Sequence, residues 1–263
     1  MLRPRIIPCL LVQKNGLVKT RGFRDPKYIG DPINAVRIFN EKEADELLVL
    51  DIDATVDGRE PNFELVERLA SECRMPVCYG GGISTVDQVV RLVNLGVEKI
   101  AISSAAIRTP AILGEMALAV GRQSIVVVID VRMRTTFFGR SYQVCTHNGA
   151  VYHNLNPIEL AVTLQSYGVG EIVVNSIERD GTMGGYDVEL ARSFKGVLDV
   201  PLTFLGGAGT FDHMVDLVSA VGNVGCAAGS MFVFKGKFRA VLISYPTFSQ
   251  KQGIVTETRK INK

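Results

Sequence analysis

The sequence predicts a single (βα)8 barrel, an α/β fold, and two observations support this prediction. Eight apolar runs of four to seven residues recur along the 263-residue chain, and most are rich in Val, Ile and Leu, as parallel strands buried on both faces should be. Most of these runs are separated by stretches with helical spacing. Such alternation of strands and helices is compatible with two main folds, a closed barrel or an open doubly wound sheet. Strand number and length favour the barrel. The predicted strands are Ile6–Val12, Leu47–Asp51, Pro76–Tyr79, Lys99–Ser103, Ile125–Asp130, Glu171–Asn175, Pro201–Leu205 and Val224–Ala228.

Two helix starts can be placed between these strands. Gly30-Asp31-Pro32 is typical of an N-cap followed by proline at the first helical position, and the predicted helix runs to about Glu46. Ser84-Thr85-Val86-Asp87 offers a capping-box-like start for a later helix. We assign residues 1–246 to the barrel and residues 247–263 to a polar tail, which we expect to be disordered.

The chain repeats itself at a spacing of about half its length. The glycines at 80–82 recur at 206–209, an offset of 126, and the small residues at 103–106 are echoed by Gly229-Ser230 at the same offset. Two similar half-barrels are therefore expected, with two similar binding sites on one rim.

The composition excludes several functional classes. A balance of 29 basic to 27 acidic residues is too even for a nucleic-acid footprint. The five scattered cysteines indicate reduced thiols in a cytoplasmic protein, and none of the three histidines has metal-ligand spacing. No apolar run reaches the length of a membrane span, and the amino terminus lacks a signal-peptide cleavage site. We expect neither a metal nor a cofactor.

Glycines and small hydroxyl residues follow four of the predicted strands, at the rim where such barrels hold their active sites. Exposed backbone N–H groups and hydroxyls are what a phosphate needs, although a single glycine loop equally serves a tight turn. Four such loops, paired by the repeat, favour a ligand with two phosphates. The residues are Gly82, Ser103, Ser104, Gly207, Gly209, Gly229 and Ser230.

Charged residues lie near the same rim. Asp51 and Asp130 close the second and fifth strands, where a catalytic carboxylate is favoured over a structural one. Asp180, after the sixth strand, could bind a hydroxyl or order its loop. Lys19, after the first strand, could pair with a phosphate or be a solvated surface charge.

Six segments together resemble the cyclase subunit of imidazole glycerol phosphate synthase, in register from about residue 2 to residue 235. That family forms a (βα)8 barrel that receives ammonia from a glutaminase docked on its amino-terminal face. The ammonia crosses the barrel and attacks a substrate with two phosphates. The segments are Arg5-Ile-Ile-Pro-Cys-Leu, Gly30-Asp31-Pro32, Gly80-Gly-Gly-Ile83, Gly170-Glu-Ile-Val, Ser176-Ile-Glu-Arg-Asp-Gly-Thr182 and Gly206-Gly-Ala-Gly209.

The resemblance implies roles for individual residues. Lys19 would lie in a mobile loop that closes over the substrate, and it would act in catalysis together with Asp130. The phosphate-binding residues would be Gly82, Ser103 and Ser104 at one site, and Asp180, Gly181, Thr182, Gly207, Gly229 and Ser230 at the other.

The family's ammonia entrance is a ring of four charged residues at the bottom of the barrel. Arg5, Glu46, Lys99 and Glu171 occupy the matching positions, each at or just before a predicted strand start. Any one of them alone would be read as ordinary salt bridging, but two cations and two anions from four strands favour a closed ring.

Three positions depart from the family pattern. The family uses two aspartates as general acid and base; Asp130 matches one, but Leu11 stands in place of the other. Loss of such a group typically costs roughly 10²–10⁴-fold in rate. Ser103 replaces an asparagine, and Leu205 replaces a serine. These changes indicate that ammonia delivery is kept and that the acceptor has changed.

The combination resembles a divergent branch of the family from surface-polysaccharide (lipopolysaccharide O-antigen) pathways. There the barrel and a glutaminase feed ammonia to a third protein, a sugar-modifying amidotransferase that builds an acetamidino group. The acceptor would be a phosphorylated or nucleotide sugar. The segment 232–246 also departs from the usual final helix of the cyclase.

Three alternatives remain open. The chain could be a true histidine-pathway cyclase that tolerates Leu11, although the lost aspartate opposes this. It could be a non-catalytic scaffold that conducts ammonia, although such a conduit needs no phosphate loops. A phosphate-binding barrel without an ammonia partner would not explain the charged ring.

Overall fold

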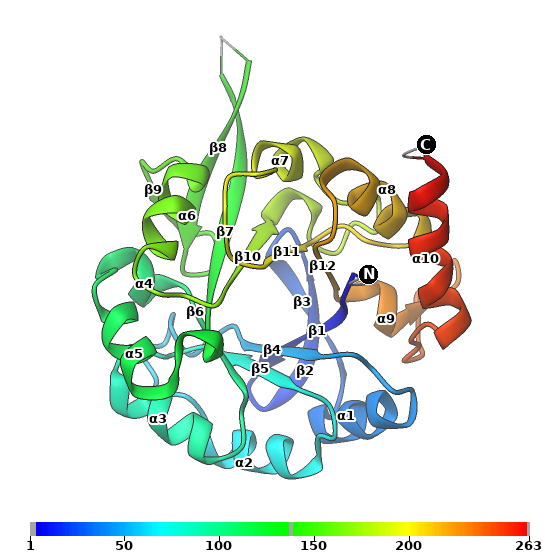
Figure 1. The fold of residues 1–263 in the computed structure, drawn as a ribbon. Helices are drawn as coiled ribbons and strands as arrows, with labels where there is room; N and C mark the ends of the chain where they lie inside the picture. Colours follow the sequence, from blue (N-terminus) through cyan, green and yellow to red (C-terminus); the bar gives the residue numbers. More distant parts are fainter. Residues whose placement is uncertain (1–3, 137–138, 262–263) are drawn as a thin grey trace.

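A computed structural model describes residues 4–136 and 139–261, and eight parallel strands form a closed barrel within them (Figure 1). Neighbours pair in the order β10, β11, β12, β1, β4, β5, β6, β7, and β7 pairs with β10 to close the ring. The predicted (βα)8 fold is confirmed. The barrel strands are β1 (Ile6–Gln13), β4 (Leu47–Asp51), β5 (Val77–Gly80), β6 (Lys99–Ile102), β7 (Ile125–Thr136), β10 (Glu171–Ser176), β11 (Leu202–Leu205) and β12 (Gly225–Ala228).

Helices surround the barrel because the strands are apolar on both faces. Outward side chains such as Val49, Ile100 and Ile129 pack in the core against the helices, whereas Leu48, Ala101 and Val128 fill a second core inside the barrel. The helices are α1 (Pro32–Glu41), α2 (Phe63–Glu72), α3 (Val86–Asn94), α4 (Ser104–Arg108), α5 (Ile112–Val120), α6 (Pro157–Gln165), α7 (Val188–Ser193), α8 (Phe211–Val221), α9 (Ser230–Val233) and α10 (Phe248–Ile261), with short 3-10 turns at Arg122–Ser124 and Ile177–Arg179.

Both predicted helix starts are present, but α1 ends five residues earlier than expected. Asp31 caps α1 by accepting from the Asn34 N–H, and Thr85 and Gln88 form a reciprocal capping box on α3. After Glu41 the chain turns because Glu43 adopts a left-handed conformation (φ 52°) and the following N–H bonds back to the Phe39 carbonyl. This is a Schellman-type stop, which ends the helix before Glu46.

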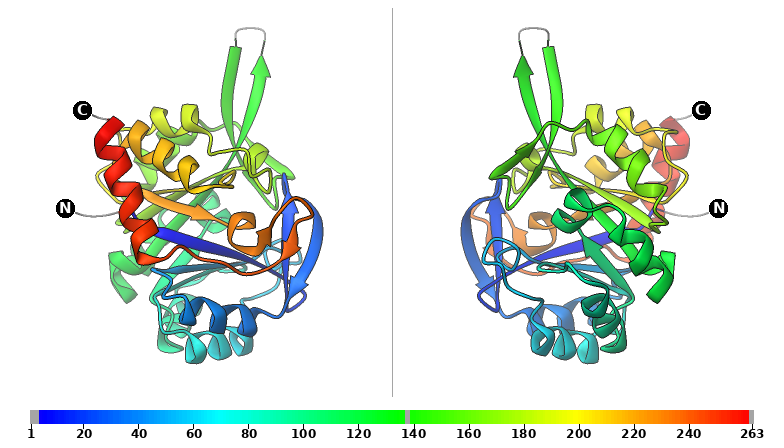
Figure 2. Two further views of the ribbon diagram at one scale, coloured as in Figure 1. Left: turned by 90° about the vertical axis from the view of Figure 1, so that its right-hand side faces the viewer. Right: turned by 90° about the vertical axis from the view of Figure 1, so that its left-hand side faces the viewer.

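Two antiparallel extensions of barrel strands, β1–β2–β3 and β7–β8–β9, lengthen the carboxyl end of the barrel, and the sequence does not predict them. Strands β2 (Gly16–Arg21) and β3 (Arg24–Gly30) form an antiparallel pair directly after β1. Strand β7 continues past Asp130 to pair with β8 (Gly139–Thr146), which pairs with β9 (Val151–His153). The β7–β8 pair projects as a narrow arm well beyond the rest of the molecule (Figure 2).

The segment after Thr247 is helical, so the expected disorder is wrong for Phe248–Ile261. Helix α10 lies against α8 (Figure 1) and buries Lys251 and Ile254. The Lys251 ammonium donates to the Asp45 carboxylate at 2.8 Å and to the Glu43 carbonyl at 3.1 Å, which explains how a polar segment can dock. Residues 262–263 lie outside the described part, and the division of the chain at 246 stays a prediction.

Before α10, a short antiparallel pair follows α9. Its strands are β13 (Phe234–Lys235) and β14 (Ala240–Val241). Within the described ranges, no helix combines the length and the apolar character that crossing a membrane requires.

Candidate functional site

A cavity of about 770 Å³ opens at the carboxyl ends of the barrel strands, as expected for this fold. Its wall is formed by the loops that follow the strands, together with the β2–β3 and β8–β9 hairpins. Most of the residues predicted to form the site meet here, namely Lys19, Gly82, Ser103, Ser104, Asp130, Asp180, Gly181, Gly207, Gly229 and Ser230.

The glycines of this wall are required by close packing of the loops. A Cβ atom on Gly82 would lie 2.4 Å from the Arg59 carbonyl oxygen, and one on Gly207 would lie 2.1 Å from the Gly185 carbonyl oxygen. Both glycines also have positive φ. The packing alone therefore explains why only glycine fits, and the phosphate role of these loops stays a prediction.

Thr182 does not join the others. Its hydroxyl donates to the Arg179 carbonyl at 2.8 Å and accepts from the Gly184 N–H at 3.3 Å, and the residue lies outside the cavity wall. Its place in the sequence next to Gly181 suggested a phosphate ligand, but the turn uses the hydroxyl internally.

Lys19 lies in strand β2, not in an irregular loop, and only 5% of it is exposed. Its Nζ donates to the Cys9 carbonyl oxygen at 2.5 Å. Burial lowers the pKa of the Lys19 ammonium, and the negative charge of Asp180 acts in the opposite direction. The lysine amino group is thus nearly buried in the cavity wall, and it is not a solvated surface charge.

Asp180 orders the neighbouring hairpin. Its Oδ2 accepts from the Thr20 hydroxyl at 2.6 Å and from the Phe23 N–H at 3.1 Å, while its carbonyl accepts from the Gly22 N–H at 3.1 Å. The carboxylate oxygen Oδ2 is therefore engaged in holding β2–β3 on the loop after β10. The structure thus supports the loop-ordering alternative for this residue.

Asp130 lies where β7 leaves the barrel, with its carboxyl in the cavity wall. Asn175 Nδ2 donates to its Oδ1 at 2.9 Å. Burial raises the pKa of Asp130 to about 7; the hydrogen bond from Asn175 opposes this rise, and the charge of Asp180 adds to it. A carboxyl that titrates near 7 can both accept and give a proton at neutral pH. Asp51, by contrast, accepts from the N–H groups of Asp53 and Ala54, and so has the structural role.

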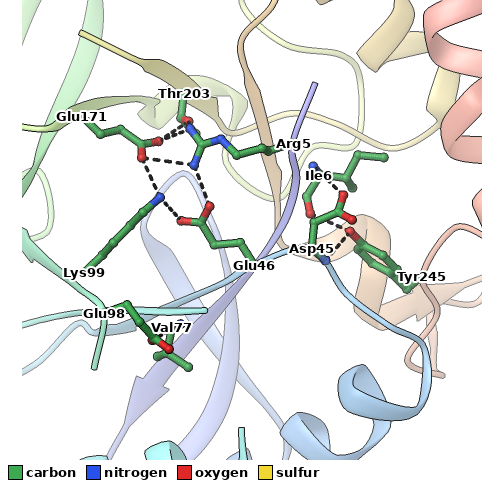
Figure 3. A network of polar contacts seen from close by, with 10 residues as sticks. All are labelled: Arg5, Ile6, Asp45, Glu46, Val77, Glu98, Lys99, Glu171, Thr203 and Tyr245. Atoms are coloured by element: carbon green, nitrogen blue, oxygen red, sulfur yellow. Dashed lines mark hydrogen bonds and ion pairs between the residues drawn. The ribbon is translucent and has the colours of Figure 1, made fainter. Parts of the chain in front are cut away.

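At the opposite end of the barrel, Arg5, Glu46, Lys99 and Glu171 meet in a ring (Figure 3). Arg5 donates to Glu46 and to Glu171, each at 2.6 Å. Lys99 Nζ donates to Glu46 at 2.7 Å and to Glu171 at 2.9 Å. Each cation thus bridges both carboxylates, and the Thr203 hydroxyl completes the network with a 2.6 Å bond to Glu171.

The pairing in this ring favours the charged forms of Arg5, Lys99 and Glu171. Burial opposes the charged forms of Arg5 and Lys99, but Glu171 and Glu46 outweigh it and raise the pKa of both cations. Burial likewise opposes ionisation of Glu171, yet the hydrogen bond and charge of Arg5, with the charge of Lys99, lower its pKa.

Between the ring and the cavity the barrel interior is apolar. The inward side chains of Leu48, Val126 and Val173 belong to a buried cluster that also contains Cys78 and Ala227. Loss of hydration on this path would cost a charged species far more free energy than a small neutral molecule.

A family profile described as "Histidine biosynthesis protein" matches residues 5–239. A provisionally named imidazole glycerol phosphate synthase subunit HisF of Leptospira borgpetersenii is 53% identical over 254 residues, which cover 97% of this chain and 99% of the relative. The chain belongs to the HisF family. A provisionally named subunit hisF3 of Vibrio vulnificus is 54% identical over 252 residues, 96% of each chain. The imidazole glycerol phosphate synthase subunit HisF of Hyphomonas neptunium is 39% identical over 234 residues, 89% of this chain and 91% of that one.

The three departures from the family pattern lie together in the cavity of this HisF-family barrel. Leu11 and Leu205 line it beside Leu50, and all three pack on the apolar core of the barrel interior. Ser103 also lines it, and its buried hydroxyl has no hydrogen-bond partner among the described residues. The floor around Asp130 is thus more apolar than the family pattern implies.

Other polar groups of the cavity were missed by the sequence reasoning. Thr146 Oγ1 lies 2.9 Å from His153 Nε2 and 3.0 Å from His147 Nδ1, and all three line the cavity with Arg59 and Arg108. The histidines were considered only as metal ligands, and the pairing of β8 with β9 that joins them was not foreseen. Among the described residues, no His, Cys, Asp or Glu group is arranged to hold a metal.

Replacing Asp130 with asparagine should stabilise the protein at alkaline pH. The folded-state pKa of about 7 lies above the ordinary 3.8, so ionisation increasingly opposes folding from about pH 4 to about pH 7, and the penalty persists above that range. A neutral amide escapes it. By urea unfolding, we expect Asp130→Asn to exceed wild type by about 1–3 kcal/mol at pH 8, with the difference disappearing by about pH 4. A pH-independent difference would contradict this assignment.

Proposed function

We propose that this HisF-family chain accepts ammonia from a partner glutaminase at its amino-terminal face and passes it through the barrel to an acceptor in the cavity. It would be an ammonia-dependent synthase of the lyase class that works in the cytoplasm. The observation that supports this most is the placement of the charged ring and the cavity at opposite ends of one apolar interior.

The ring has the properties of a gate. Glu46 and Glu171 are buried and held by two cations each, whereas the side chains of Arg5 and Lys99 are 32% and 21% exposed. The two cations can therefore move toward solvent while the carboxylates remain. Breaking one pair would leave the other partner buried and unpaired, so the closed state is favoured until a docked partner offers an alternative. Neutral ammonia could then enter and the ring could close again.

The glutaminase is proposed on two grounds. The ring faces the amino-terminal end, where the family docks its glutaminase, and each relative quoted above is itself named as a subunit.

For the acceptor, we propose a phosphorylated sugar or nucleotide sugar, with an acetamidino sugar of O-antigen or related surface polysaccharide as the product and a third, sugar-modifying amidotransferase as a further partner. Leu11, Ser103 and Leu205 support a changed acceptor. Two relatives support it as well, because their names hisF3 and hisF2 carry the kind of number that is given to additional copies in one organism. The cavity still offers the predicted phosphate loops at Gly82 and Gly229.

Histidine-pathway cyclisation is the second candidate, because a relative named without qualification as imidazole glycerol phosphate synthase subunit HisF is 39% identical. Leu11 opposes it. A purely conducting scaffold would explain the ring but not a cavity whose wall carries Asp130 and Lys19.

Lys99→Ala should uncouple glutamine use from ammonium use. Removing Lys99 leaves each carboxylate with one cation fewer and loosens the gate, while ammonium added to the solvent can reach the cavity from the open end. In the complete complex, we expect the ratio of glutamine-driven to ammonium-driven rates to fall about tenfold. That factor corresponds to a difference of roughly 1.4 kcal/mol between the free energies of the two routes. Lys42→Ala removes an exposed cation near the amino end of β4 and should not change the ratio. An unchanged ratio for Lys99→Ala and for Arg5→Ala would mean that the ring is ordinary salt bridging.

The missing aspartate can be tested on the histidine-pathway substrate. With ammonium as nitrogen source, the isolated chain should be slower than a family member with both aspartates by roughly 10²–10⁴-fold, because only Asp130 remains to transfer protons. Leu11→Asp should recover part of the rate, and Leu50→Asp at a neighbouring wall position should not. Turnover by the wild-type chain at the rate of an ordinary cyclase would overturn the changed-acceptor proposal.

A further inference from the structure

The β2–β3 hairpin, residues 16–30, is held against the loop that contains Asp180 and Gly181. Asp180 receives three hydrogen bonds from Thr20, Gly22 and Phe23, as described above. Gly181 lies so close that a Cβ on it would meet the Thr20 carbonyl oxygen at 2.1 Å. The hairpin therefore depends on this loop for its position.

A second segment, far away in the sequence, holds the same loop from the other side. Arg239, in the turn between β13 and β14, donates from Nη2 to the Gly181 carbonyl at 3.2 Å. Its guanidinium lies 6.0 Å from the Phe234 ring centre, and Lys27 of β3 lies 5.8 Å from the same ring. Figure 2 shows this orange segment beside the blue hairpin.

The β13–β14 segment is itself anchored to the body of the protein. Phe234 is buried, and the N–H groups of Leu242 and Ser244 donate to the Val233 and Phe232 carbonyls at 2.8 and 2.9 Å. Arg239 is therefore fixed relative to α9, and it can hold the Gly181 loop in place. That loop in turn holds the hairpin.

The hairpin carries Lys19 into the cavity. Its ammonium contacts the Cys9 carbonyl and approaches Gly229 so closely that a Cβ there would lie 2.6 Å from Nζ. A lysine amino group that is buried with a single hydrogen bond to a backbone carbonyl loses its contacts with water, so its position requires that the hairpin be held down.

We propose that Arg239 is a positioning residue: through Gly181 it holds the β2–β3 hairpin closed over the cavity and so keeps Lys19 inside it. The proposal rests on the proposed function only in that the cavity is taken as the reaction site. The β13–β14 pair lies in the segment that departs from the family's usual final helix. In this chain, the proposal gives that pair the role of presenting Arg239 to Gly181.

The test is the rate at which lysine amines react with acetic anhydride, followed residue by residue by mass spectrometry on the intact chain. Lys19 should react slowly in wild type. It should react about threefold to tenfold faster in Arg239→Ala and in Arg239→Gln, as expected for loss of one charge-assisted hydrogen bond in a half-exposed place. Asp180→Asn should give an increase at least as large, because it weakens the direct tether.

Two controls separate hairpin opening from general loosening. Lys251 of α10 is also buried, and the Asp45 carboxylate and the Glu43 carbonyl hold it. Its reactivity should therefore stay constant in every variant. Lys237→Ala removes an exposed cation from the same turn as Arg239 and should leave Lys19 slow. The proposal is overturned if Lys19 stays slow in both Arg239 variants, or if it becomes reactive only together with Lys251. The experiment measures lysine reactivity and not ammonia transfer, so failure of this proposal would not count against the proposed function.

Discussion

The salt-bridged ring of Arg5, Glu46, Lys99 and Glu171 is the interaction on which the organisation of this barrel depends. Its members come from the starts of β1, β4, β6 and β10, so the ring ties together strands that are far apart in the sequence. Because each cation is shared by both carboxylates, no member is left unpaired at the barrel mouth. A buried network of this kind is costly unless every member is paired, so moving any one cation out of the ring would destabilise its partners, and this is the property on which the proposed gate relies.

The other end of the barrel follows a different principle. Glycines let the loops pack tightly around a cavity, and two hairpins extend its wall, one carrying Lys19 and the other Thr146 and the two histidines. Burial leaves Asp130 as a carboxyl that titrates near neutrality on an apolar floor formed partly by Leu11 and Leu205. Under the proposed function, ammonia would enter at the charged ring and react at the cavity, where Leu11 and Leu205 make the surroundings of the acceptor more apolar.

The sequence predicts most of the barrel because each buried strand is a short, nearly continuous apolar run. The ring is implied by the resemblance to the family, and the position of its charges at strand starts places it at the amino-terminal end. Other features depend on contacts that no local pattern reveals. The early end of α1 follows from Glu43 in a left-handed conformation, and β3 is an exposed run of charged residues with a proline, a composition that resembles a loop. Thr182 shares a motif with Gly181, yet its hydroxyl is used within its own turn. His153 reaches Thr146 only through the pairing of β8 with β9.

The central claim is that nitrogen travels from a glutaminase through the ring and the apolar interior without mixing with solvent. The most direct measurement supplies the complete complex with amide-¹⁵N glutamine together with unlabelled ammonium, at an ammonium concentration that by itself supports only a small fraction of the glutamine-driven rate, and then determines the isotope in the aminated product. The account predicts a product that carries mostly ¹⁵N in wild type and loses this enrichment in Arg5→Ala. A wild-type product with the isotope ratio of the bulk solution would contradict it.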